Sequence, residues 1–451
     1  MRPVVARSPG LIVGVKAVTV LYVGLFLWHL NATIIQPPFA DMYSVVLHYL
    51  AYRADGGSLD YLWASHNEHR PVFLRLLTAF DIEMFAGVSY PFVVTAAIAH
   101  VGTAWLLWRE CRAGVAGTLG LVLGCFVLML VLTSVTAVVV AIPIMNNLIH
   151  GLAFVVLAIV VFERVEAVRG AGGAAVFGRR AAVLLVACLV PFADAVGWAV
   201  WPILVWIAWR AGAERKWLWT VVGVGAALLI VYTRGLSLTL PVSDGTDRGI
   251  GLADELARRV HYLFVYMGLP WTRSPDLFVP ARLVGALLFV TGTGVVLWRG
   301  VFRAPSGRLE RIAIALMMFS LASGVLAAIG RAHMPAIGGV LVPVRYSVLL
   351  IPLHVGLLLV ASPVFERLWS RRGQSLTVSV CVVGACVGLL LQQMVAGAAA
   401  VSNAERIRAT IERFHAGQSD EGMVTVIDED LEKARRELAV MRRAGVYVGV
   451  R

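Results

Sequence analysis

Five polar residues stand side by side between two apolar parts of the chain: His66, Asn67, Glu68, His69 and Arg70. Imidazole and carboxylate groups bind metal ions and serve as general acids and bases. An arginine binds phosphate oxygens through a planar fork of N–H donors. The segment therefore indicates a metal site, a catalytic or phosphate-binding cluster, or a solvated loop between membrane helices.

A further carboxylate, Asp41, stands at the start of a segment with helical spacing, residues 39–53. Positions 41, 48 and 52 share one face of a helix, so we expect Asp41, His48 and Tyr52 to form a polar stripe. A carboxylate there can act as a general base. Asp also often caps a helix by accepting a bond from a backbone N–H. Both roles are open for Asp41, and we favour the base.

The composition places these residues in a membrane protein. Of the 451 residues, 59% are hydrophobic and 15% are charged, against roughly 45–50% and about 25% in soluble domains. Apolar stretches of about twenty residues recur along the chain, which is the length that a helix needs to cross a bilayer. We therefore predict an all-α polytopic membrane protein. The net charge of +12 comes almost entirely from Arg, and we do not expect a nucleic-acid partner.

About eleven spans are predicted. Their approximate ranges are 11–31, 89–108, 117–142, 147–165, 181–193, 196–209, 217–234, 279–299, 312–330, 346–363 and 376–398. The fifth and sixth are short and surround PFADAVG (191–197), which indicates two shallow helices held by protein rather than by lipid.

The basic residues predict the orientation. With the N-terminus in the cytoplasm, five basic loops fall on the cytoplasmic face, as the positive-inside rule requires. These loops are 109–112, 164–180, 210–216, 298–311 and 366–372. The exterior face then receives residues 32–88, 142–151, 191–197, 235–278, 331–347 and the tail from 399. We expect a bacterial inner-membrane protein with an extracytoplasmic C-terminus and active site.

The exterior segments carry helices of their own. In the first exterior loop we expect a helix at 39–53 and a second at 71–87, which is short for a span and contains three charged residues. In the long loop, residues 252–268 are expected to lie along the membrane interface.

The C-terminal tail is predicted to form a small exterior helical hairpin from residues 404–414 and 428–443. This divides the chain into a transmembrane domain, 1–398, and a small extracytoplasmic tail, 399–451.

Several function classes are disfavoured. Most predicted spans have no acid or base in their central part and there is no internal repeat, which argues against a secondary transporter. No pore filter is visible, and no GxxxxGK[ST], GxSxG or HExxH motif occurs. The polar residues gather at one face instead. This pattern favours chemistry at the outer membrane surface on a lipid-borne substrate.

Three segments in order carry a resemblance to a known family. They are PPFADMYSVVLHYLAY, which contains Asp41, then HNEHRPVFLRLLTAFDIEMFAG, and then WLLWREC at the end of a span. This order resembles the GT-C superfamily of polyprenyl-phosphate-sugar-dependent glycosyltransferases, which includes protein O-mannosyltransferases and lipid A aminoarabinose transferases. The resemblance is architectural and covers most of the chain.

Two positions depart from the family pattern. Many relatives have paired acids where Asp41 is followed by Met42. Several also have a second acid in the second exterior loop, where this chain has Met145, Asn146 and Asn147, with His150 close behind.

The resemblance implies an inverting transfer of a sugar from a polyprenyl-phosphate donor to a cell-envelope glycan or lipid on the extracytoplasmic face. Such a transfer needs a carboxylate to take the acceptor proton and cations to stabilise the departing phosphate. Asp41 is the expected base. No cofactor is required, although some relatives use a divalent cation such as Mg²⁺ or Mn²⁺.

Arg345 is the first candidate for binding the donor phosphate and Arg331 the second. Both can also be arginines that extend from a span to the membrane surface. In the polar cluster, His69 and Arg70 are expected to contact the donor phosphate or sugar, and Glu68 to orient one of them or bind a sugar hydroxyl.

His66 belongs to the same expected donor-binding set. Further candidates for the site are His48, Asn147, His150, Asp194 and His261. Asp194 alternatively satisfies exposed backbone between two half-spans. If a metal binds, the expected ligands are Asp41, His66, Glu68 and His69, but this set is thin without a second acid.

Two other functions compete with glycosyl transfer. One is a transporter or flippase for a lipid-linked glycan. The other is a non-catalytic membrane scaffold that binds a polyprenyl lipid, for which neither Asp41 nor Arg345 would matter beyond stability.

The first prediction concerns the base. Replacing Asp41 by Ala or Asn should abolish measurable sugar transfer without loss of folded protein, because a general base contributes about 10²–10⁴-fold to rate. Transfer is measured in membranes that contain equal amounts of each variant. Full activity of Asp41→Asn would contradict the assignment.

Overall fold

The structure, a computed structural model, describes most of the chain, and its regular elements are helices. The described residues are 9–36, 41–57, 60–66, 70–167, 174–236, 252–269, 271, 278–332, 343–372, 376–418, 423, 426–427 and 430–446. The predicted all-α fold is confirmed for this part of the chain. Asn67, Glu68 and His69 of the polar cluster lie outside it.

Eight helices in the described residues are long and apolar enough to cross a bilayer. They are formed by α1 (Pro9–Thr33), α5 (Tyr90–Gly114), α8 (Asn146–Ala167, preceded by the 3-10 helix η1, Pro143–Met145), α9 (Ala174–Ala193), α11 (Arg215–Thr233), α13 (Phe278–Val295, continued by the π-helix η5, Val296–Phe302), α14 (Arg308–Arg331) and α17 (Leu376–His415). The chain is therefore a polytopic helical membrane protein.

Two bent helix pairs raise the number of candidate spans to ten if each pair is one span. The first pair is α6 (Gly117–Val131) with α7 (Ser134–Ala141), which bends by 46°. Its bend falls at Thr133, whose hydroxyl caps α7 by accepting a bond from the Val135 N–H at 3.1 Å. The second pair bends by 41° and comprises η6 (Val344–Leu350) and α15 (Ile351–Val360), followed by α16 (Ser362–Arg372).

The remaining predicted span, 196–209, is a shorter apolar helix made of η3 (Ala195–Ala199) and α10 (Val200–Arg210). Each predicted span therefore coincides with a helix. The predicted number of about eleven is higher than the eight to ten that helix length and composition support in the described residues.

Two helix boundaries differ from those predicted. The fifth span is not short, because α9 begins at Ala174 within the predicted loop 164–180. Arg180 fits in this helix because its guanidinium lies 4.8 Å over the Trp217 ring and 3.9 Å from the Glu214 and Glu166 carboxylates. The helix α17 does not end at 398 but continues to His415. The sequence after 397, AAAVSNAERIR, contains mostly good helix formers and no Pro.

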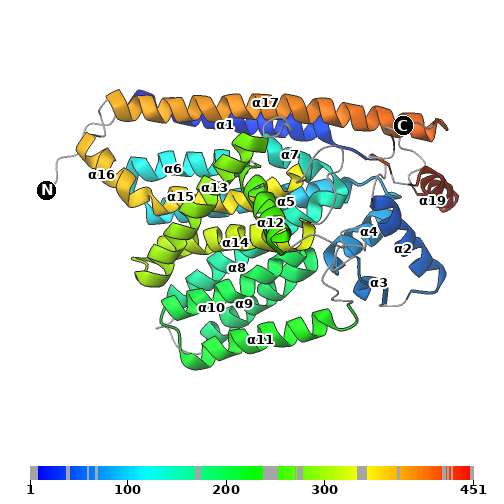
Figure 1. Ribbon diagram of the computed structural model, residues 1–451, viewed down its shortest axis with the longest axis horizontal. Coiled ribbons are helices and arrows are strands. Elements are labelled where there is room, and N and C mark those ends of the chain that lie inside the picture. The colour runs from blue at the N-terminus through cyan, green and yellow to red at the C-terminus, as the bar shows by residue number, and fades with distance from the viewer. Residues whose placement is uncertain are drawn as a thin grey trace.

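Figure 1 shows most of the long helices running side by side in one direction. At one end lie α2 (Met42–Ala54), α3 (Asp60–Trp63), α4 (Val72–Phe85) and α19 (Leu431–Arg443), and we call this the α2 end. The beginning of α1 and the helix α16 lie at the opposite end, the α16 end. Along one edge, α1 and α17 pack against each other. They approach closely at Gly397, where a Cβ would come within 1.8 Å of the His29 ring.

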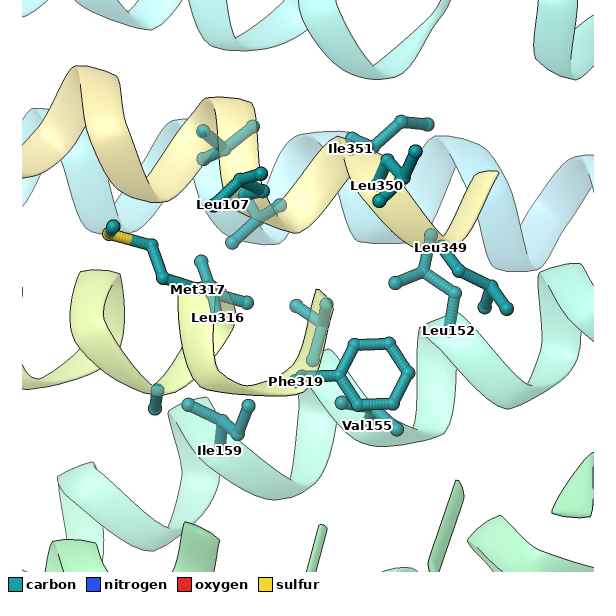
Figure 2. Packing of buried hydrophobic residues seen from close by; sticks show 14 of the residues in the cluster. Leu107, Leu152, Val155, Ile159, Leu316, Met317, Phe319, Leu349, Leu350 and Ile351 are labelled. Carbon is teal, nitrogen blue, oxygen red and sulfur yellow. The ribbon is translucent and has the colours of Figure 1, made fainter. Parts of the chain in front are cut away.

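The apolar core lies between α5, α8, α14 and α15 (Figure 2). The buried side chains drawn there are Leu107, Leu152, Val155, Ile159, Leu316, Met317, Phe319, Leu349, Leu350 and Ile351. The helices α14 and α15 come close because Gly356 has no side chain. A Cβ at Gly356 would lie 2.4 Å from Met317 and 2.6 Å from the Ala313 carbonyl oxygen. Small residues at such contacts are typical of membrane helices.

At the α16 end, buried carboxylates join the helices by ion pairs. Glu110 of α5, 3% exposed, accepts hydrogen bonds from both Arg164 of α8 and Arg308 of α14. Glu163, fully buried, pairs with Arg311 at 2.8 and 3.0 Å. Together with the contacts of Arg180, these ion pairs connect four of the five predicted basic loops. The four loops are 109–112, 164–180, 210–216 and 298–311. The fifth loop is α16 itself, at the same end (Figure 1). The predicted grouping of the basic loops is therefore confirmed.

The α2 end has a second apolar core, which the segment between α1 and α5 shares with the tail. The predicted helices at 39–53 and 71–87 are present as α2 and α4, and at 14 residues α4 is shorter than the candidate spans. Tyr43 and Val46 of α2 are buried in the same cluster as Phe414 of the α17 extension and Leu438 of α19. The predicted tail hairpin thus consists of the end of α17 and α19, packed on α2.

The predicted interface helix is α12 (Leu252–Gly268). Its second half is buried against α13 and α14 rather than lying on a surface. Glycines explain the close contact, because a Cβ at Gly285 would lie 1.7 Å from the Phe264 carbonyl oxygen and a Cβ at Gly268 would lie 2.1 Å from that of Ala281.

The second prediction concerns the ion pairs at the α16 end. Glu110→Gln removes the charge that pairs with Arg164 and Arg308, and breaking a buried ion pair costs about 3–5 kcal/mol. The apparent Tm of the purified protein in detergent should therefore fall clearly. The matched control is Glu366→Gln, because Glu366 is exposed at the same end. Equal Tm values for the two variants would show that the Glu110 pairs do not stabilise the bundle.

Candidate functional site

Three residues at helix ends meet at the α2 end of the bundle. The helices α8, α9 and α14 each have one end in the ion-pair network, at Glu163, Arg180 and Arg308. Their opposite ends carry Asn147 and Arg331, with Asp194 directly after α9. Because these helices are long enough to cross a bilayer, their far ends lie together on the other side of the core.

Asp194 occupies the break between α9 and η3. Its backbone is extended, and its Oδ1 caps η3 by accepting a bond from the Val196 N–H at 2.9 Å. Its Oδ2 accepts a bond from Asn147 Nδ2 at 3.1 Å. The absence of a side chain at Gly151 lets α8 approach, since a Cβ there would lie 3.0 Å from the Asp194 Cβ. The predicted role of Asp194 in satisfying backbone between two half-spans is confirmed, and one carboxylate oxygen also binds a second predicted site residue.

The two predicted phosphate-binding arginines lie close to Asp194. Burial raises the pKa of Asp194 to about 6, while the positive charges of Arg331 and Arg345 oppose that rise. Arg331 lies in the last turn of α14, and Arg345 lies in η6 with its guanidinium 5.5 Å from the Tyr346 ring centroid. The structure therefore brings four of the predicted residues into one group, which we call the Asp194 group: Asn147, Asp194, Arg331 and Arg345.

Two tyrosines of α12 border this group, and sequence reasoning missed both. Tyr266 is buried, its hydroxyl 3.2 Å from Ser323 Oγ and its ring 5.8 Å from that of Tyr346. Burial raises the pKa of Tyr262, and the charges of Arg331 and Arg345 oppose the rise. The Tyr262 hydroxyl is buried without a hydrogen-bond partner among the described residues. The spacing of four between the tyrosines was a visible signal that both lie on one face of a helix.

His150 lies one turn after Asn147 in α8, and among the residues that the structure describes no hydrogen bond or ion pair joins either His150 or His261 to the group. The His150 Nδ1 is 2.7 Å from the Asn146 carbonyl oxygen, and its ring lies 4.6 Å from that of Phe73 in α4. Burial lowers the pKa of His261, and the neighbouring charge of Arg282 lowers it further.

Arg70 is engaged with backbone rather than open to a ligand. It is 4% exposed. Its Nε donates to the Tyr232 carbonyl at 2.8 Å, and its terminal nitrogens donate to the carbonyls of Trp63 and Arg234. The Tyr232 hydroxyl accepts a bond from the Arg70 backbone N–H at 3.0 Å. Arg70 therefore ties the segment between α3 and α4 to the end of α11, and its contact with a donor phosphate stays a prediction.

Arg75 binds the same loop from α4. Its Nη1 donates to the Tyr61 carbonyl at 2.7 Å and to that of Ala64, and its Nη2 donates to the Ser65 carbonyl at 3.2 Å. Arg75, one of the three charged residues of the helix predicted at 71–87, is only 2% exposed. A guanidinium can be buried in this way because several carbonyl dipoles surround it.

His48 and His66 are placed near this buried arginine. Burial lowers the pKa of His48, and the nearby charges of Arg75 and His66 lower it further. The described residues contain no group of three or more His, Cys, Asp or Glu placed to hold a metal ion. Glu68 and His69 of the predicted metal set lie outside the described residues, so this set stays a prediction.

Asp41 is exposed and stands directly before α2. Its side chain makes no capping hydrogen bond, so the predicted cap is not observed. The predicted stripe is not uniformly polar, because the intervening Val45 is buried and the Tyr52 ring stacks on Tyr61 at 5.0 Å. Within the described part of the chain no hydrogen bond or ion pair joins Asp41 to the Asp194 group, and its role as a base stays a prediction.

An apolar cleft lies between α1, α6, α15 and α17. It is narrow, with a cavity volume of about 30 Å³, and its wall includes Met129, Ile351 and Leu389. Ser347, which shares η6 with Arg345, also lines it. The Trp271 indole N–H donates to His354 Nε2 at 2.9 Å on another wall.

The third prediction follows from the pKa of Asp194. Because this pKa is higher in the folded protein than the ordinary 3.8, the folded state binds more protons between about pH 4 and 6, and stability falls as pH rises through that window. Asp194→Asn removes this contribution. The apparent Tm of the variant minus that of the wild type should therefore be larger at pH 7.5 than at pH 5. The same difference at both pH values would contradict the raised pKa.

Comparison with known proteins adds no assignment to this geometry. Neither protein-family models, nor curated proteins, nor solved structures give a match to the chain. The function must therefore be inferred from the site itself.

Proposed function

We propose that this protein is a glycosyltransferase of the GT-C type, which moves a sugar from a polyprenyl phosphate to a cell-envelope glycan or lipid. The observation that carries the proposal is the meeting of Arg331 and Arg345 near one carboxylate, Asp194, at the α2 end. Guanidinium groups are well suited to bind the oxygens of an anion. We take the α2 end as extracytoplasmic because the basic loops gather at the other end.

The arginine pair suits the phosphate of the donor. Guanidinium groups bind phosphate oxygens through paired N–H donors. The Asn147 amide and the Val196 N–H hold the Asp194 carboxylate in place. The Asp194 carboxylate therefore offsets part of the positive charge of Arg331 and Arg345. Because two donors hold it in place, it does not shift towards either guanidinium group.

The apolar cleft suits the lipid part of the donor. Ser347 lines the cleft and lies two residues after Arg345 in η6. An isoprenoid chain against Ile351 and Leu389 would therefore leave its phosphate close to Arg345. Burial of apolar chain surface favours such binding by about 25 cal/mol per Å².

Asp41 is the proposed general base. In the reaction the acceptor oxygen forms a bond to the anomeric carbon, and the bond from that carbon to the phosphate oxygen breaks. The acceptor proton passes to the carboxylate, and polyprenyl phosphate leaves with one additional negative charge. Arg331 and Arg345 stabilise this charge as it develops. The exposure of Asp41 fits a base that meets an acceptor from outside the membrane.

The fourth prediction tests the donor site. Undecaprenyl phosphate should bind to the purified protein, and Arg345→Ala should weaken that binding at least about tenfold, since hydrogen bonds to charged groups contribute about 1.5–3 kcal/mol. Native mass spectrometry measures the bound fraction. Arg282→Ala is the control, because Arg282 is exposed at the start of α13.

A proteoliposome assay separates the three functions. A transferase consumes a labelled polyprenyl-phosphate sugar without a gradient when an acceptor extract is present, and EDTA tests for a divalent cation. A flippase would move the same lipid unchanged across the bilayer. A scaffold would bind it without either outcome, and each of these two results would overturn the proposal.

A further inference from the structure

The C-terminal tail reaches the segment that connects α1 to α2. Beyond the membrane core, α17 continues to His415 with Ala404, Ile407, Ile411 and Phe414 buried along one face. These residues share a core with Ile35 and Met42, which flank the connection. The first exterior loop is therefore packed on its outer side by the far end of the chain.

Arg408 makes the polar contact at this junction. Its Nε and Nη2 donate to the Ile34 carbonyl at 3.3 and 3.1 Å, and Nη2 also donates to the Ala32 carbonyl. Because α1 ends at Thr33, Ala32 lies in its last turn. The last four carbonyls of a helix have no partner within the helix, and a cation is favoured there by the helix dipole. Arg408 thus satisfies the end of α1 and the first residue after it.

The same segment is held from its other side. The Ser89 hydroxyl donates to the Gln36 carbonyl at 3.1 Å. The backbone N–H of Ser89 in turn donates to both carboxylate oxygens of Asp81 in α4, at 3.0 and 3.1 Å. The connection is therefore anchored at Ala32, Ile34 and Gln36, and Asp41 follows five residues after the last anchor.

The tail is itself braced where it turns back. Arg435 of α19 donates to the carbonyls of Gly417 and Gln418 at 3.1 and 2.9 Å, and its guanidinium lies 5.7 Å from the Phe414 ring centroid. With the turn held in this way, α19 packs on α2. The tail thus contacts α2 through α19, and the end of α17 packs beside the start of α2.

We infer that Arg408 is a positioning residue, which fixes the start of α2 and thereby the place of Asp41 relative to the Asp194 group. This inference rests on the proposed function for its catalytic consequence. The arginine acts through the backbone of residues 32–36 and does not touch the substrate. A displacement of about 1 Å at a reacting group can cost about 10²-fold in rate.

The fifth prediction compares Arg408→Ala with two other variants. In Arg408→Lys the ammonium can still donate to the carbonyls of Ala32 and Ile34, so this variant should retain most of the function. Arg406→Ala is the matched control, because Arg406 is exposed two residues earlier on the same helix and its side chain donates to Asn403. All variants are studied as the full-length protein in proteoliposomes.

Four quantities are measured: hydrogen exchange in α2, kcat, KM for the donor and binding of undecaprenyl phosphate. In Arg408→Ala, hydrogen exchange in α2 should be faster than in wild type, and kcat for donor consumption should fall at least about tenfold. The KM for the donor and the binding of undecaprenyl phosphate should change less than about twofold, because Arg331 and Arg345 belong to other elements. Arg406→Ala should match wild type in all four quantities.

The outcomes separate this inference from the proposed function. Unchanged exchange in α2 of Arg408→Ala overturns the inference, whatever the protein catalyses. Faster exchange with unchanged kcat also overturns it, because Arg408 would then stabilise the fold without placing a catalytic group. If the wild-type protein consumes no donor, the proposed function fails, and the exchange comparison alone decides whether Arg408 fixes the start of α2.

Discussion

Charge cannot be left unpaired in the hydrocarbon core of a bilayer, and this constraint organises the whole molecule. The charged groups described above lie at the two ends of the helices, and their interaction partners differ between the two ends. At the α16 end, Glu110 and Glu163 are buried and paired with arginines from neighbouring helices. At the α2 end, Arg331 and Arg345 lie near one carboxylate that backbone and amide donors also hold. At the first end carboxylates and arginines from different helices pair directly, whereas at the second end two arginines act on a carboxylate that other donors hold.

Backbone carbonyls take the place of carboxylates at the α2 end. Arg70, Arg75 and Arg408 each donate to carbonyl groups of loops or helix ends. Irregular backbone beside a membrane needs partners for its polar groups, and a guanidinium supplies up to five donors in one plane. These three arginines therefore hold loop and helix-end backbone in place, whereas the charges of Arg331 and Arg345 act on Asp194.

The sequence predicted the helices far better than their contacts. Apolar length was sufficient to predict where the membrane helices lie, because hydropathy is a local property, although the predicted number of about eleven exceeds the eight to ten candidate spans in the described residues. The α17 continuation was missed because a change from apolar to amphipathic sequence does not end a helix that lacks a breaker. The role of Arg70 was beyond local reasoning, since its partner Tyr232 is 162 positions away. Asp194 and Asn147 were identified singly, but only the fold shows that they bind each other.

The unbroken course of α17 has a mechanical consequence. Its 40 residues correspond to a rod of about 60 Å, since each residue adds about 1.5 Å, and the hydrocarbon core is only about 30 Å thick. Helices adjust to bilayer thickness by tilting. Because α17 is longer than the hydrocarbon core is thick, a change in its tilt displaces its outer end. Arg408 near that end binds the carbonyls of Ala32 and Ile34, before α2. The thickness of the surrounding membrane is therefore coupled, through one helix, to the place where α2 begins.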